Sequence, residues 1–190
     1  LLDLPSARWL VTVSDEGQAR SFDVDAGFAP VVQATLDSVD TQPLVVESAD
    51  SDPWVVAANL ARSSVHSVVL HPDSTVVDFD LPEGARLQAP PVIAHISGED
   101  VVAVLYDGVV DVRRPDGSPV DASVWPIELP EAAAPDSMGW IVAWPDPDGD
   151  QMVDDRIAVA NERGQMSRVS AVDGARLLGD ATGAAPVDEL

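Results

Sequence analysis

The sequence has 190 residues, of which 33 are Asp or Glu and 10 are basic, so its formal net charge at pH 7 is −23. A surface this acidic repels nucleic acids and anionic lipids, which excludes both as expected partners and favours cations or basic proteins. The chain has no cysteine, which excludes disulfides and Cys-ligated metals, and no apolar run approaches the ~20 residues that a membrane-spanning helix requires.

Short apolar stretches separated by Gly, Pro and Asp follow one another along the whole chain. Almost none has a helical period, and the spacing is typical of strands joined by tight turns. The stretch 30–36 fits either a strand or a short helix. The predicted strands cover residues 10–13, 19–24, 30–36, 44–46, 54–57, 67–70, 76–81, 92–96, 101–105, 109–112, 140–144, 157–160 and 166–172.

The clearest predicted hairpin spans residues 101–112. Asp107 and Gly108 supply the positive φ angles that a tight hairpin turn needs, and apolar strands flank them. Residues 101–105 are Val-Val-Ala-Val-Leu and do not alternate with polar residues. Both faces of this strand are therefore expected to be covered by other parts of the protein.

The hairpin unit recurs along the chain. A strand, a turn, a second strand and an acidic turn follow one another four times, and a similar Trp-led strand starts at Trp54 and at Trp140. Recurrence of this kind predicts two related halves and favours stacked β-sheets. The first-turn residues are Gly17, Ser74, Gly108 and Gly164, and the glycines that close the units are Gly27, Gly84, Gly117 and Gly174.

The sequence thus predicts an all-β protein built from propeller-like blades of short antiparallel strands. A β-sandwich is the alternative, but its strands have one wet face and should alternate. We expect one domain over residues 1–178, with related halves of about 1–90 and 91–178. Residues 179–190 are small and acidic and are expected to form a disordered tail.

The units resemble the blades of quinoprotein-type and FG-GAP-type β-propeller repeats. The resemblance is closest in the acidic loop at 146–155, which leads into the strand at 157–160. FG-GAP loops place acidic or amide ligands at relative positions 1, 3, 5 and 9 and glycine at position 4, which Gly149 matches here. The resemblance implies a calcium site formed by Asp146, Asp148, Asp150 and Asp154.

The residue types in this loop suit that ion on chemical grounds as well. Carboxylate oxygens are the ligands that Ca²⁺ prefers, and glycine lets the backbone fold round the ion. The alternative is an acidic turn that is merely solvated, as expected in a chain this rich in Asp. If Ca²⁺ binds, its expected role is to stiffen the loop.

Other constellations point away from catalysis. The three histidines (His66, His71 and His95) fit no zinc motif, and no Gly-x-Ser-x-Gly or phosphate-binding loop occurs. Trp125 and Trp144 each precede a proline. They are candidates for exposed anchors that contact a protein or carbohydrate partner, with packing as the alternative.

These observations favour a non-catalytic scaffold or recognition module of a secreted or cell-envelope protein, stiffened by calcium. The alternative is a structural subunit that contributes blades or edges to a larger multi-chain assembly. A third interpretation is an enzyme domain, either quinone-dependent or a hydrolase.

Overall fold

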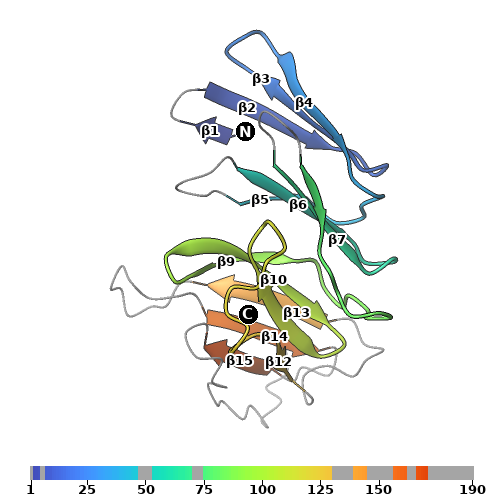
Figure 1. Ribbon diagram of the computed structural model, residues 1–190, viewed down its shortest axis with the longest axis vertical. Coiled ribbons are helices and arrows are strands. Elements are labelled where there is room, and N and C mark those ends of the chain that lie inside the picture. The colour runs from blue at the N-terminus through green and yellow to red at the C-terminus, as the bar shows by residue number, and fades with distance from the viewer. Residues whose placement is uncertain are drawn as a thin grey trace, which may run out of the picture. The chain divides into compact units, whose positions relative to one another are not determined.

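The computed structural model describes residues 2–4, 7–46, 53–69, 75–129, 139–144, 156–161 and 166–170, and this part of the chain is all-β (Figure 1). The strands form four small antiparallel sheets, and within each sheet the strands follow in chain order. The chain divides into two compact units, one of Leu1–Glu83 with Pro115–Gly117 and one of Gly84–Arg114 with Ser118–Leu190. The predicted all-β class is confirmed.

The first unit contains two four-stranded sheets. The first sheet has the order β1-β2-β3-β4 and the second has the order β5-β6-β7-β8. Their bounds are β1 (Leu2–Leu4), β2 (Ala7–Val13), β3 (Gln18–Asp23), β4 (Ala29–Thr35), β5 (Leu44–Val46), β6 (Trp54–Asn59), β7 (Ser64–Val69) and β8 (Val76–Asp78).

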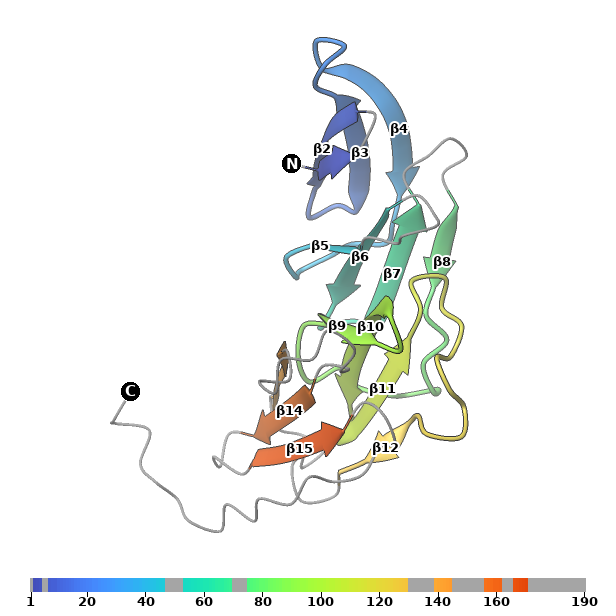
Figure 2. The same ribbon diagram turned by 90° about the vertical axis from the view of Figure 1, so that its left-hand side faces the viewer.

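The second unit contains the other two sheets, and the third sheet ends in the short strand β12 beside β11 (Figure 2). Three strands of the fourth sheet lie in the described part of the chain. The bounds are β9 (Val92–Ile96), β10 (Glu99–Tyr106), β11 (Val109–Arg113), β12 (Ile127–Glu128), β13 (Gly139–Trp144), β14 (Arg156–Asn161) and β15 (Met166–Ser170).

The predicted hairpin of the third sheet is confirmed. Tyr106 pairs with Val109, so Asp107 and Gly108 form a two-residue turn, and their φ angles are 45° and 78°. Two positive φ values are those of the turn type that matches the twist of the flanking strands. This turn fixes the register in which β10 and β11 pair.

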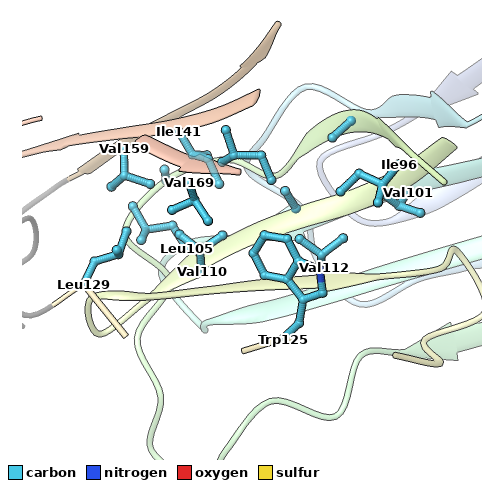
Figure 3. Packing of buried hydrophobic residues seen from close by; sticks show 14 residues of the cluster. Ile96, Val101, Leu105, Val110, Val112, Trp125, Leu129, Ile141, Val159 and Val169 are labelled. Atoms are coloured by element: carbon cyan, nitrogen blue, oxygen red, sulfur yellow. The ribbon is translucent and has the colours of Figure 1, made fainter. Parts of the chain in front are cut away.

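The core of the second unit lies between the third and fourth sheets (Figure 3). Leu105 and Val110 project from the third sheet toward Ile141 and Val159 of the fourth. Trp125 comes from the connector before β12 and completes the cluster. The buried members are Ala89, Ala94, Ile96, Val101, Ala103, Leu105, Val110, Val112, Trp125, Leu129, Ile141, Ile157, Val159 and Val169.

The first unit has a smaller core of the same kind between its two sheets. Most of its members are Ala or Val, and Val11, Val13 and Val45 pack against it. The buried members are Ala19, Ala34, Leu36, Val39, Val55, Ala57 and Val68. Sheet-on-sheet packing through alternate strand residues therefore builds the interior of each unit.

The inner strand β10 of the third sheet is buried on both faces. Val101, Ala103 and Leu105 belong to the core cluster, and Val102 and Val104 on the opposite face are also fully buried. The non-alternating sequence predicted this arrangement. It distinguishes stacked blades from a two-sheet sandwich, in which one of the two faces would be exposed.

The predicted repeat was wrong in one unit. Alignment at Ser74 placed the second hairpin between β7 and β8, whereas the equivalent hairpin in the topology joins β6 to β7. Its turn contains Ser63, which has a φ of 55° where the aligned units have glycine. Trp54 consequently lies in the second strand of its sheet and Trp140 in the first described strand of its own, so the two are not at equivalent places.

Smaller differences concern the strand bounds. β1 gives the first sheet a leading strand that the sequence pattern did not indicate, residues 30–36 form a strand rather than a helix, and β12 lies within a predicted connector. The expected tail at 179–190 lies outside the described residues. No helix in the described part of the chain is long and apolar enough to span a membrane.

Candidate protein-binding surface

The first strand of the fourth sheet presents two large apolar side chains to solvent. Along β13 the residues alternate, so Ile141 joins the core while Trp140 and Val142 point to the opposite side. Trp140 is 56% exposed and Val142 is 52% exposed. We call this side of the sheet the open face.

The neighbouring strand contributes small residues to the open face. The antiparallel register places Ala160 across from Trp140 and Ala158 across from Val142, and directly opposed residues share a face. Ala158 is buried and Ala160 is half-buried. The register also places Trp144 across from Arg156 and Ala158 across from Arg168. The open face therefore combines the exposed Trp140 and Val142 with two alanines and two arginine positions.

Backbone contacts hold β13 in place. The Gly139 N–H donates to the Gln88 carbonyl at 2.9 Å, and the Gln88 N–H donates to the Leu105 carbonyl at 3.0 Å. A Cβ at Gly139 would lie 2.7 Å from Leu105 Cδ2, so the absence of a side chain lets β13 approach this close. The Gln88 side chain also accepts from the Gly108 N–H at 2.6 Å. These contacts anchor the start of β13, the strand that carries Trp140 and Val142.

Such a surface has the composition of a protein interface. Isolated exposed apolar residues are ordinary, but an exposed Trp next to a second large apolar side chain on a strand is typical of an interaction site. Aromatic residues also supply much of the binding free energy at protein interfaces. This arrangement suits contact with another protein.

A second exposed aromatic residue lies in the β3–β4 turn. Phe28 is 56% exposed and has a φ of 64°. Its N–H donates to the Asp23 carbonyl at 2.8 Å, while Asp23 Oδ1 accepts from the N–H groups of Asp25 and Ala26. Phe28 therefore has the exposure of Trp140 but lies on a turn instead of a sheet face.

The first unit contains a Ser–His–Asp sequence of hydrogen bonds. His66 Nε2 lies 3.0 Å from Ser64 Oγ, and His66 Nδ1 lies 2.6 Å from Asp78 Oδ1. The His66 side chain is only 6% exposed, whereas that of Asp78 is 77% exposed. A catalytic imidazole must reach its substrate, so this arrangement suits a tie between β7 and β8 better than catalysis.

An ion pair lies at the turn of the β6–β7 hairpin, which contains Arg62. Arg62 Nη1 donates to both carboxylate oxygens of Asp37, at 2.9 and 3.0 Å. The Ser38 N–H and the Arg62 guanidinium both bind the ionised carboxylate, and they lower the pKa of Asp37 below its ordinary value of 3.8. Both side chains are at least half exposed, so the pair is screened by solvent.

The two tryptophans predicted as partner anchors have different outcomes. Trp125 is 3% exposed and packs in the core of the second unit, so its side chain is not available to a partner. The alternative interpretation, in which Trp125 packs in the core, is therefore the one that the structure shows. The backbone of Trp144 belongs to β13, but its side chain lies outside the described part of the structure, and a contact with protein or carbohydrate there stays a prediction.

The predicted calcium ligands cannot be placed. Asp146, Asp148, Asp150 and Asp154 all lie outside the described residues, so the calcium site stays a prediction. Within the ranges that are described, no three His, Asp or Glu side chains gather as metal ligands would.

The sequence pattern missed the exposure of Trp140. Residues 140–144 are Trp-Ile-Val-Ala-Trp, which is apolar on both faces of a strand. That pattern predicts packing on both sides, as in residues 101–105. A single sequence cannot show that one of the two sides has no neighbour within the described chain.

Comparison with known proteins supports the fold. No protein-family model matches the sequence, and no curated protein matches it either. Among solved structures, the chain is similar to the crystal structure of BBS1N in complex with ARL6DN, soaked with lead. The TM-score is 0.54 and the identity is 13%, over 92% of this chain and 52% of that chain.

That neighbour is a β-propeller domain, and the fold of this chain is accordingly β-propeller-like. An identity of 13% shows the fold alone. The chain spans about half the length of the neighbour. The finer resemblance to quinoprotein or FG-GAP repeats is not supported by this likeness and stays a prediction.

Proposed function

We propose that this protein is a non-catalytic scaffold or recognition module that binds a protein partner through the open face. The observation that carries the proposal is the exposure of Trp140 and Val142 on a strand whose other side is packed in a core. The neighbouring propeller was crystallised in complex with a protein, ARL6DN, which supports a role of this kind for the fold.

The net charge of −23 narrows the class of partner. Acidic surfaces attract basic proteins and raise their association rates, and they repel nucleic acids and anionic membranes. We therefore expect a basic protein partner and weaker or slower association at high salt. The open face and the acidic charge together favour one form of scaffold, a structural subunit of a multi-chain assembly.

We propose that the protein is secreted or lies in the cell envelope, where a site with low affinity for calcium can still be occupied. The acidic loop at 146–155 is the site. Ligand binding to the folded state raises stability by about 2.7 kcal/mol when the calcium concentration is ~100 times the Kd. A higher melting temperature in calcium, lost in Asp148→Asn, supports the site, and an unchanged melting temperature contradicts it.

Native mass is the direct test of the proposed function. The protein is purified from its native source under mild conditions, and its mass is measured by light scattering at low and at high salt. We expect a complex that contains a second protein in a fixed ratio. A mass equal to that of the protein alone, at both salt concentrations, contradicts the proposal.

A further inference from the structure

The outer edge of the first sheet is formed by β4, which ends the strand order β1-β2-β3-β4 (Figure 2). β4 has seven residues, whereas the outer strands β8 and β12 of the second and third sheets have three and two. In the third sheet, Pro119 of the connector also forms a bridge with Arg113 along the edge. Within the described part of the chain, the first sheet therefore has a longer open edge than either of these sheets.

The register shows which backbone groups of β4 reach this edge. The Leu36 N–H donates to the Gly17 carbonyl at 2.8 Å, and the next opposed pair is Thr35 with Gln18. Hydrogen-bonded and non-hydrogen-bonded pairs alternate along an antiparallel ladder. The N–H and C=O groups of Gln33 and Thr35 therefore point away from β3, toward the open edge.

These outward-pointing groups lie on a regular part of the strand. Gln33 and Thr35 are exposed, and no strand of the described chain pairs with this side of β4. Val31 is the extra residue of a bulge and has no partner on β3, and Pro30 precedes it. Both irregularities lie at the start of β4, so they leave the stretch around Gln33 and Thr35 straight enough to pair.

The core beside this edge is incompletely covered at its outer margin. Ala34, between the two outward-pointing residues, belongs to the core of the first unit. Val76 of β8 is opposed to Val68, another member of that core, so it lies on the core side of the second sheet. Val76 is nonetheless 40% exposed, and Val31 is exposed to the same extent. An added apolar side chain at this margin would remove apolar area from water.

We propose that the edge of β4 binds an extended segment of a partner protein, which adds to the first sheet as a fifth strand. The site is separate from the open face, so the inference goes beyond the proposed function. A row of N–H and C=O groups at strand spacing is complementary to one kind of ligand, an extended backbone with the same spacing. Hydrogen bonds to Gln33 and Thr35 would provide the affinity.

The two faces of the first sheet determine which side chains that segment should carry. Directly opposed residues share a face of the sheet. Residues opposed to Gln33 and Thr35 would join a polar face that also carries Thr12 and Arg20, so they should be polar. The residue between them would be opposed to Ala34 on the core side, where a large apolar side chain fits the incomplete margin. The segment should therefore alternate polar and apolar residues.

Other occupants fit this edge less well. In the register that pairs Gln33 of one copy of the chain with Thr35 of another, Ala34 would oppose Ala34. Alanine is too small to cover the exposed apolar area at the core margin. A helix is unsuitable because its own N–H and C=O groups are already bonded internally.

The test uses random peptides displayed on phage and selected on the full chain. Selected peptides are titrated against Gln33→Pro and against Gln33→Ala, the matched control. Proline removes the outward N–H and preserves the ladder to β3, because that N–H takes no part in it. Alanine removes the side chain alone. Melting temperatures verify that the variants fold, and Thr35→Pro repeats the test at the second outward-pointing residue.

Amide hydrogen exchange, resolved by residue with NMR, provides a readout that needs no substitution. In the free protein, the amides of Gln33 and Thr35 should exchange fast and that of Ala34 slowly, since only the last is bonded to β3. A bound peptide should slow exchange at Gln33 and Thr35 about tenfold or more. Unchanged exchange at both residues in the presence of saturating peptide contradicts strand addition.

We expect the selected peptides to alternate polar and apolar residues and to bind Gln33→Ala as tightly as the wild type. Gln33→Pro should weaken their binding about tenfold or more. Peptides that bind Gln33→Pro as tightly as the wild type, or a selection that yields no peptide, overturn the inference. A dimer of the chain that Gln33→Pro dissociates also overturns it, because the edge would then bind a second copy. None of these outcomes involves the open face, so the proposed function is tested separately.

Discussion

The two units reach stability by different means. The core of the second unit is built from bulky side chains, among them Trp125, Leu105 and Ile157, whereas that of the first unit is mostly Ala and Val. The first unit adds polar bonds that join the connector before β5 to the β6–β7 turn. Asp40 accepts from the N–H groups of that turn, and Thr41 exchanges hydrogen bonds with the Ala58 backbone.

This difference shows how a core of small residues is supplemented. Small side chains bring sheets together but bury little apolar area per residue, so hydrogen bonds to buried groups carry more of the specificity. The second unit should therefore be most sensitive to the loss of side-chain volume. The first should be most sensitive to the loss of a close backbone approach or a buried polar partner.

The largest effect is expected in the core of the second unit. Trp125→Ala removes its largest buried side chain and should lower the free energy of unfolding by about 3–5 kcal/mol. Trp140→Ala is the matched control, and it should change stability by less than about 0.5 kcal/mol because Trp140 is exposed. Urea unfolding followed by circular dichroism measures both. Equal losses for the two variants would contradict the assignment of these tryptophans.

The next effect concerns a close approach in the first unit. Gly17 has a φ of 79°, and a Cβ there would lie 2.3 Å from the Asp37 carbonyl oxygen. Left-handed strain and the forced backbone shift should together cost about 2–4 kcal/mol in Gly17→Ala.

Gly27 separates these two contributions. Its φ is 72°, but a Cβ there meets nothing within 4 Å, so Gly27→Ala should cost only about 1–2 kcal/mol from backbone strain. The difference between the two melting curves measures the close approach. If Gly17→Ala is no worse than Gly27→Ala, the contact with Asp37 is absent.

A buried amide should give a smaller loss. Asn59 donates to the Ser38 carbonyl at 2.8 Å and to Ser38 Oγ at 2.9 Å, and it accepts from the Arg62 N–H at 2.9 Å. Asn59→Ala leaves these groups unpaired and should cost about 1–3 kcal/mol. Gln33→Ala, which removes an amide on an exposed face, should cost less than about 0.5 kcal/mol in the same unfolding measurement.

The smallest effect is a change in pH dependence. The pKa of Asp37 is lowered by the Ser38 N–H and the Arg62 guanidinium. Its ionised form therefore contributes stability that is present above pH 3.8 and is lost as the pH falls through the lowered pKa. Melting temperatures between pH 5 and pH 2.5 should fall less steeply in Asp37→Asn. Parallel curves for the variant and the wild type would contradict the pairing.

Local patterns predicted much of the fold. Asp107-Gly108 identified its hairpin because the two residues allow a turn that few others adopt. The unbroken apolar run at 101–105 predicted a strand that is buried on both sides. These features depend on neighbouring residues in the chain, so one sequence contains the information.

Features that depend on distant residues were missed or misplaced. Ser63 takes a left-handed turn conformation without glycine. Alignment of the units on their glycines therefore placed the second predicted hairpin one strand too late in its sheet. Trp125 lies in a Pro-containing connector, and its burial depends on packing against the third and fourth sheets. The open face was missed because local sequence cannot report whether a layer lies above a strand.

The short strand β12 has a consequence for aggregation. It pairs with only two residues of β11, Val109 and Val110. Beyond these two residues, the connector that precedes β12 lies along the edge of β11. The Val120 N–H donates to the Val112 carbonyl, and Pro119 forms a bridge with Arg113. A proline cannot donate to an incoming strand, and a loop that covers an edge protects it from edge-to-edge pairing. The outer margin of the third sheet is thus protected against fibril-like growth.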